Sequence, residues 1–133
     1  MTDNPTPPRR GGDPVDRDRS SVLPDHDRRT AARMLALAAL EPGGGEMWGA
    51  LRIAVGDLNM VRPFDWPAWK EPWPETADDV SGLDEELVGK HMTRIVRSDR
   101  FIEGNFEGAV RMGLVSWLVL RWLEITAPTG SPG

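Results

Sequence analysis

The feature that most constrains the fold is the segment LVSWLVLRWLEI, residues 114–125, which is apolar on nearly every side. Only Ser116, Arg121 and Glu124 interrupt the pattern, so a helix formed here has to be covered by several neighbours. The segment is too short to cross a bilayer, because a membrane-spanning helix needs about 20 apolar residues. It therefore predicts a helix that either forms the centre of a bundle or meets another subunit.

Two earlier segments predict helices that can supply this cover. Residues 25–41 are rich in alanine and leucine, begin with two aspartates that can cap a helix, and stop at Pro42 and a run of glycines. Residues 46–60 predict a second helix, because apolar side chains recur at spacings of three and four and so share one face. Those side chains are Trp48, Leu51, Val55 and Leu58.

The strongest helix signal lies between Ser81 and Phe101. Ser81 and Asp84 resemble a capping box, and acids in the first turn followed by basic residues match the helix dipole. The apolar arc holds Val88, Met92, Ile95 and Val96, and the opposite arc, expected to face solvent, holds Lys90, Arg94 and Arg97. Residues 104–113 then predict a short helix that ends at Gly113.

These segments together define the fold class and the domain. No segment alternates apolar and polar residues as a strand does, so the prediction is all-α, a compact bundle of about four to five helices in residues 25–127. Residues 1–24 hold five prolines, two glycines and few apolar side chains, which predicts a disordered tail. Residues 128–133 are expected to be a frayed C-terminus.

Residues 61–76 predict a connector rich in tryptophan and proline, since four prolines exclude a long helix. Asp65 followed by Trp66 and Pro67 predicts a capped single turn. The aromatic side chains either lie across the helical core as a lid or form a surface that holds a ligand or stacks bases. They are Phe64, Trp66, Trp69 and Trp73.

Charge and cysteine usage exclude several function classes. The first 24 residues carry four arginines and four aspartates, so the formal charge of -5 belongs to the rest of the chain and disfavours nonspecific nucleic-acid binding. The absence of cysteine excludes disulfides and thiolate metal sites. No secretory signal or membrane span is visible, so we expect a cytoplasmic protein, and we expect neither a metal nor a cofactor.

The stretch RIVRSDRFIEG, residues 94–104, concentrates charges between two predicted helices. In a structural interpretation Phe101 turns into the core, Gly104 permits a bend, and the acids pair with amides at the start of the next helix. In a functional interpretation the charged residues form an exposed binding surface, although a buried ion-pair latch between the helices is equally consistent with them. The residues concerned are Arg97, Asp99, Arg100 and Glu103.

An enzyme would have to combine His91 as a base with carboxylates. Glu103 and Glu107 share one helix face and Asp99 lies nearby in sequence. However, the chain contains no E-x-x-H or H-x-x-x-H motif, no serine elbow and no glycine-rich phosphate loop. His91 is more simply a half-buried core histidine, and we lean towards a non-enzymatic protein.

Nucleic-acid binding would instead use a basic patch on the acidic surface. The arginines available are Arg94, Arg97, Arg100 and Arg111. Residues 104–124 have the length of a helix-turn-helix, but the recognition helix would offer a DNA groove almost no polar side chains.

The leading interpretation is a small protein-interaction or regulatory module. It would bind a protein partner or associate with itself. Such a module should expose an apolar patch, which we expect to involve Trp117 or Trp122.

The C-terminal half also carries a recognisable pattern: a helix, then R-x-[DE]-R-F-x-[DE]-G, a short helix, a glycine and a last apolar helix. The matching residues are Arg97, Asp99, Arg100, Phe101, Glu103, Gly104, Gly113 and Leu114, and Phe64, Trp66 and Trp69 match an upstream F-x-W-x-x-W. With these residues the chain resembles a family of uncharacterised bacterial and phage proteins, domain of unknown function 6508. Ser98 and Ile102 depart from its pattern, which often has glycine and cysteine there. The resemblance implies a compact helical domain and a fixed role for the Arg-Phe turn, and it implies no activity.

Overall fold

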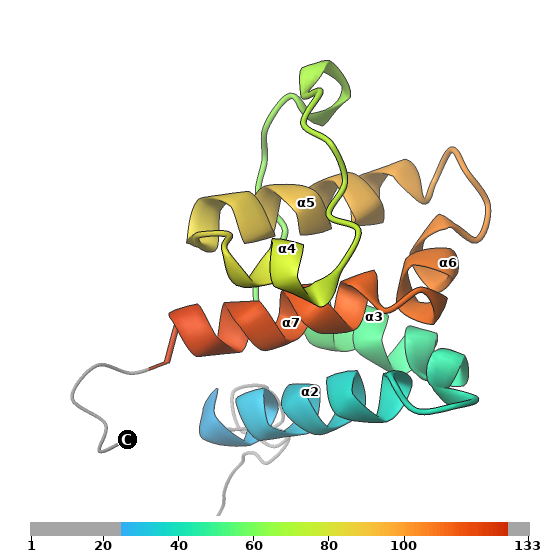
Figure 1. Cartoon of the computed structure of the whole chain (residues 1–133), viewed down its shortest axis with the longest axis vertical. Helices are drawn as coiled ribbons and strands as arrows, with labels where there is room; N and C mark the ends of the chain where they lie inside the picture. The colour runs from blue at the N-terminus through green and yellow to red at the C-terminus, as the bar shows by residue number, and fades with distance from the viewer. Residues whose placement is uncertain (1–24, 128–133) are drawn as a thin grey trace, which may run out of the picture.

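The computed structural model describes residues 25–127, and in this range the chain is all-helical without strands, as predicted (Figure 1). The elements are α2 (Asp25–Ala39), η2 (Gly44–Met47), α3 (Trp48–Asp57), η3 (Trp66–Ala68), α4 (Ala77–Ser81), α5 (Glu85–Ser98), α6 (Asn105–Arg111) and α7 (Leu114–Ile125). The short helix α4 was not predicted. The expectations for residues 1–24 and 128–133 lie outside the described residues.

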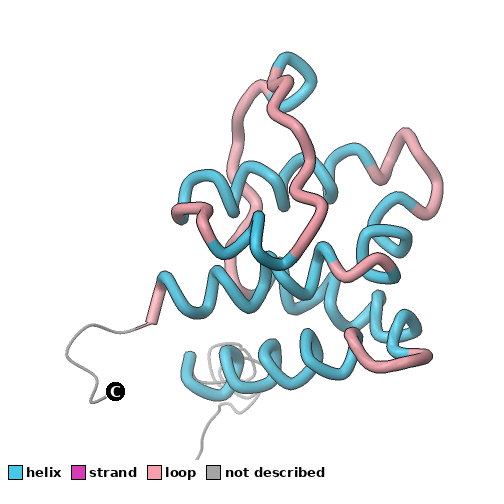
Figure 2. Tube along the Cα trace, viewed as in Figure 1, coloured by secondary structure: helices cyan, strands magenta, loops and turns pink. Residues whose placement is uncertain are grey.

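The last helix, α7, is the centre of the bundle. Figures 1 and 2 show α2 on one side of it and α5 on the other, and α4 and α6 also pack against it. Its buried residues are Leu114, Val115, Ser116, Leu118, Val119, Trp122 and Leu123. Of the two arrangements that the apolar pattern predicts, the described residues form the first, in which the helix is covered by its own chain.

Helices α2 and α3 pack against each other through a tight glycine turn. Gly43 has φ 80°, a left-handed conformation that favours glycine. Gly44 is buried against the end of α2, where an added Cβ would collide with the carbonyl oxygen of Ala38 and lie 2.7 Å from the Cα of Ala39. The two backbones can approach this closely only because Gly44 has no side chain.

The connector between α3 and α4 runs over α5 rather than over the core. Figure 2 shows it rising past α5 and returning to α4, with η3 at its tip, and η3 contacts α5. The predicted single turn is present as η3, but the Asp65 side chain makes no capping hydrogen bond. The expected lid across the helical core is wrong, because the connector aromatics pack on His91 and Arg94 of α5.

The helix starts at α4 and α5 differ from the predicted capping box. Ser81 is the last residue of α4, and its hydroxyl donates to the Asp78 carbonyl. The capping box belongs to α4, where Thr76 and Asp79 satisfy each other's backbone amides. Asp84 caps α5 alone by accepting a hydrogen bond of 2.9 Å from the Leu87 amide.

Two glycines shape the turns around α6. Gly104 precedes α6 with φ 77° and Gly113 precedes α7 with φ 94°, so both predicted glycine positions are confirmed. The prediction that Phe101 enters the core is wrong, because its side chain is 73% exposed on the outside of the turn. Phe106, on the first turn of α6, fills the core instead.

We expect Phe101→Ser to change the free energy of unfolding by no more than about 0.5 kcal/mol, as is usual for exposed positions. Phe106→Ala should destabilise the protein by about 3 kcal/mol or more, because it empties a fully buried site. Urea unfolding of both variants measures the contrast. Equal losses would show that Phe101 is part of the core.

Candidate functional site

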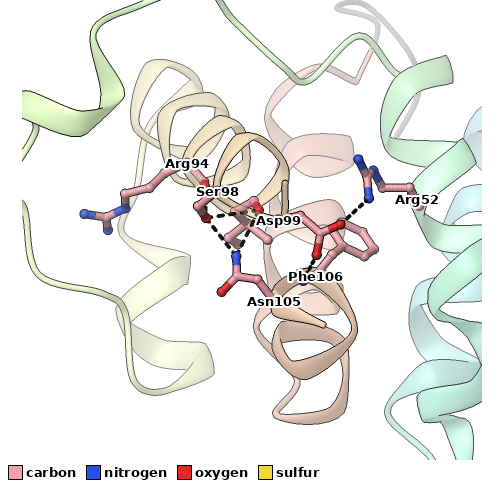
Figure 3. A network of polar contacts seen from close by, with 7 residues as sticks. Arg52, Arg94, Ser98, Asp99, Asn105 and Phe106 are labelled. Carbon is pink, nitrogen blue, oxygen red and sulfur yellow. Dashed lines mark hydrogen bonds and ion pairs between the residues drawn. The ribbon is translucent and has the colours of Figure 1, made fainter. Parts of the chain in front are cut away.

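Asp99 forms an ion pair with Arg52 of α3, and we call this pair the latch. It is partly exposed and does not join the two helices of the motif, so it differs from the buried latch that the sequence offers. Oδ2 of Asp99 lies 3.0 Å from Nη1 of Arg52, and Oδ1 of Asp99 accepts a hydrogen bond of 2.9 Å from the Phe106 amide at the start of α6 (Figure 3). The guanidinium of Arg52 also lies over the Phe106 ring, 5.3 Å from its centroid. Asp99 therefore joins the end of α5 to α3 and α6.

The other charged residues of the motif point elsewhere. Arg97, Arg100 and Glu103 are exposed, and within residues 25–127 none of them forms an ion pair. The structure therefore brings only Asp99 of the four candidate residues into a polar network.

A second network fastens α6 to the end of α5. The Asn105 amide nitrogen donates to the Ile95 carbonyl at 3.0 Å and to the Ser98 hydroxyl at 2.8 Å, and Ser98 donates to the Arg94 carbonyl at 2.6 Å (Figure 3). The contact from Asn105 satisfies the Ile95 carbonyl, which is one of the last four carbonyls of α5. Sequence reasoning missed Asn105, and the N-cap preference could not have found it, because Gly104 is the N-cap of α6 and Asn105 donates back to α5.

Asp99→Ala should lower the free energy of unfolding by about 2 kcal/mol, because it removes a helix cap and half of an ion pair. Asp99→Asn keeps an acceptor for the Phe106 amide and should lose less than half of that. Arg52→Ala should lower the free energy of unfolding by as much as Asp99→Asn does, if the Arg52–Asp99 ion pair is what stabilises this region. Thermal and urea unfolding of the three variants test it, and identical losses for Ala and Asn would exclude the capping role.

The connector aromatics gather around two side chains of α5. The ring centroids of Trp69 and His91 lie 4.7 Å apart, and the Arg94 guanidinium carbon lies 4.6 Å from the Trp69 centroid and 3.6 Å from that of Trp73. Phe64 packs edge-on against Trp69 at 5.6 Å. Trp69 and Trp73 thus stack on Arg94, as cation–π pairs do.

Arg94 is buried, which corrects its predicted place on the solvent face of α5. Only 9% of its surface is exposed. Nη1 donates to the Glu71 carbonyl at 2.9 Å and Nη2 contacts Nδ1 of His91 at 3.2 Å, while Nε has no partner in the described residues (Figure 3 shows the side chain directed away from Asn105). Burial lowers the pKa of Arg94, and the negative charge of Glu71 acts in the opposite direction.

His91 lies beneath the same aromatic rings and is uncharged at neutral pH. Burial, and then the neighbouring charge of Arg94, lower its pKa from 6.5 to about 4. Because Arg94 can only donate, Nδ1 of His91 is the acceptor and its proton is on Nε2. A base with this pKa is poorly matched to catalysis at neutral pH.

An apolar groove lies beside this cluster, and we name it the α5–α6 groove. Its volume is about 460 Å³. It is lined by Trp66, Trp73, Pro74, Glu75, Arg94, Ile95, Ser98, Ile102, Asn105, Ala109, Met112 and Leu114. The lining comes from the connector, from α5 and α6, and from the first residue of α7, so its formation depends on the whole C-terminal half of the fold.

The remaining candidate residues do not assemble into an active site. Glu107 pairs with Arg111 at 2.7 Å on α6. His91 lines a separate hollow with Glu71, Glu75 and Asp79, and Asp79 is already used in the cap of α4. Within residues 25–127 no three histidine, aspartate or glutamate side chains gather as metal ligands would.

The other predicted surfaces also differ in the structure. Because Arg94 is buried, the four arginines do not form one exposed patch. Trp122 is buried in the core and Trp117 is half-buried, so the expected exposed patch at these tryptophans is wrong. Among the described residues no helix is long and apolar enough to span a membrane.

Comparison with known proteins gives a family and nothing further. The model of a family of unknown function, DUF6508, matches residues 25–127, which is the range that the structure describes. No curated protein and no solved structure matches the chain.

Proposed function

We propose that this chain, which belongs to the family of unknown function DUF6508, is a small non-enzymatic interaction module whose α5–α6 groove binds a segment of a partner protein. The observation that carries the proposal is the continuity of the groove with exposed apolar side chains. Ile102 and Met112 line the groove and are each 58% exposed. Contiguous exposed apolar surface of this kind marks protein interaction sites.

The exposed apolar surface extends beyond the groove itself. The Phe101 ring lies 6.3 Å from Trp66, which is a groove residue, and Trp73 is also exposed. The groove volume alone would suit a small molecule. A small molecule inside the groove would leave Phe101 exposed to water. A protein segment that lies across the turn would cover both the groove and Phe101.

The residue types around the groove also favour a protein partner. Tryptophan, phenylalanine, methionine and arginine are enriched at the centres of protein interfaces, and the groove region offers all four. In this interpretation the motif from Arg97 to Gly104 supports the module by anchoring α6 through Asp99. The resemblance supports a bacterial or phage origin, and the lack of cysteine is consistent with a cytoplasmic location.

Panning a phage-displayed random peptide library on the whole chain tests the proposal. We expect enriched peptides to bind at least about tenfold more weakly to Ile102→Glu and Met112→Glu, because a charge is then placed in the apolar interface. Met34→Glu and Ile53→Glu are matched controls, since these side chains are 65% and 67% exposed on α2 and α3 and do not line the groove. The controls should bind like the wild type.

Two results would contradict the proposal. One is a set of enriched peptides whose affinity is unaffected by either groove variant. The other is a wild-type chain that sediments as a dimer and becomes monomeric in Met112→Glu, which would make a second copy the occupant of the groove.

A further inference from the structure

We infer that the segment bound in the α5–α6 groove presents a single carboxylate side chain, flanked by large apolar residues, and that this carboxylate pairs with Arg94. The inference rests on the proposed function and names the chemistry of its partner. It follows from the place of Arg94 in the groove wall, where no carboxylate of the described residues forms an ion pair with it, although the charge of Glu71 raises its pKa from further away.

The charge of Arg94 has no carboxylate partner within residues 25–127. Every ion pair in this range uses a different cation, and the acceptors of Arg94 are a backbone carbonyl and a neutral histidine nitrogen. A guanidinium has five N–H donors, of which these two contacts use two. Buried charges are ordinarily paired, so a buried guanidinium at a groove wall with no carboxylate in direct contact is unusual.

The surroundings strengthen the attraction of Arg94 for an anion. Trp69 and Trp73 stack on the guanidinium and replace water, and the groove beside it is mainly apolar. In such a setting the effective dielectric constant is lower than in water, so a carboxylate interacts more strongly than it would at an exposed arginine. The planar guanidinium also matches the geometry of a carboxylate.

Arg94 is the lining residue best able to select a charged group. Ser98 and Asn105 bond to each other and to carbonyls of α5, so their hydrogen-bonding groups are already engaged in the fold. Leu114, the first residue of α7, also lines the groove, and no side chain caps that helix. The positive end of the α7 dipole therefore adds to the preference for an anion.

Charge limits the partner to one acid rather than an acidic cluster. Glu75 lines the connector side of the groove and would repel a second carboxylate. The formal charge of -5 likewise disfavours a strongly acidic segment. The carboxylate should therefore lie against α5, with apolar neighbours over Ile102 and Met112.

Two peptide libraries provide the test. Both have randomised apolar residues at each position except the centre, which is fixed as glutamate in one library and as glutamine in the other. We expect the wild-type chain to retain the glutamate library at least about tenfold more strongly, and we expect the preference to fall below about twofold in Arg94→Gln. Thermal unfolding first checks that Arg94→Gln is folded. The comparison of the two libraries on the wild-type chain does not depend on this variant.

The outcomes separate the inference from the proposed function. Equal retention of both libraries, abolished in Met112→Glu, would show that the groove binds a peptide and that the carboxylate inference is wrong. A glutamate preference unchanged in Arg94→Gln would also overturn the inference, because another cation would then select the acid. Retention of neither library by the wild-type chain would contradict the proposed function as well.

Discussion

Gly44→Ala is expected to destabilise the protein by at least about 3 kcal/mol, at the upper end of what overpacking costs. The new Cβ would collide with the Ala38 carbonyl oxygen and lie 2.7 Å from the backbone of Ala39. Backbone atoms at the end of α2 cannot rotate away as a side chain would, so η2 has to move away from the end of α2. Differential scanning calorimetry should show a fall in Tm of about 10 °C or more.

Gly108→Ala is the matched control for this substitution. Gly108 lies inside α6, and apart from its chain neighbours and the backbone of its own helix no atom lies within 4 Å of the position that its Cβ would take. Alanine there should stabilise the protein by about 0.5–1 kcal/mol, because glycine is a poor helix residue. A loss of less than about 1 kcal/mol in Gly44→Ala would show that the α2–α3 turn is not closely packed.

Acidification from pH 7 to pH 4 is expected to remove about 3 kcal/mol of stability through His91 alone. The pKa of His91 is lowered from 6.5 in an unfolded chain to about 4 in the folded protein. Between these values the unfolded chain binds a proton that the folded protein does not, so stability rises with pH across this interval. The contribution is complete above about pH 6.5 and is lost as the pH falls to about 4.

His91→Gln isolates this contribution from that of the carboxylates, because it removes one titrating group from beneath Trp69 and Trp73 and beside Arg94. Urea unfolding of both proteins at pH 7 and pH 4 gives the two differences in stability. The advantage of the wild type over the variant should be about 3 kcal/mol smaller at pH 4. An advantage that does not depend on pH would mean that His91 titrates normally in the folded protein.

The helical framework could be predicted because local patterns decide it. The segment at 114–125 is apolar on nearly every side, which requires burial at the centre of a bundle whatever the neighbours are. Gly104 and Gly113 likewise mark left-handed turns, because few other residues adopt that conformation. The short helix α4 could not be predicted, because its five residues are too few to show a helical period.

The candidate site could not be predicted because it depends on contacts between distant segments. The helical pattern of α5 places Arg94 away from the apolar arc, and such a position predicts exposure to solvent. In the structure Trp69 and Trp73 of the connector cover Arg94 instead. Asp99 pairs with Arg52, 47 residues away, and nothing local distinguishes Arg52 from Arg97 or Arg100 as its partner. The sequence does not separate Phe101, which lies on an exposed turn, from Phe106, which lies on the buried face of α6.

The most direct test of the proposed site is a ¹H–¹⁵N NMR titration of the whole labelled chain with the tightest glutamate peptide from the libraries. The groove predicts shifts of the Ile102, Asn105 and Met112 amides and of the Arg94 Nε–H signal, whose nitrogen has no partner in the described residues. The glutamine peptide should leave the Arg94 signal in place. Shifts confined to α2 and α3 would contradict binding in the α5–α6 groove. An Arg94 signal that does not respond to the glutamate peptide would contradict the pairing of Arg94 with a carboxylate.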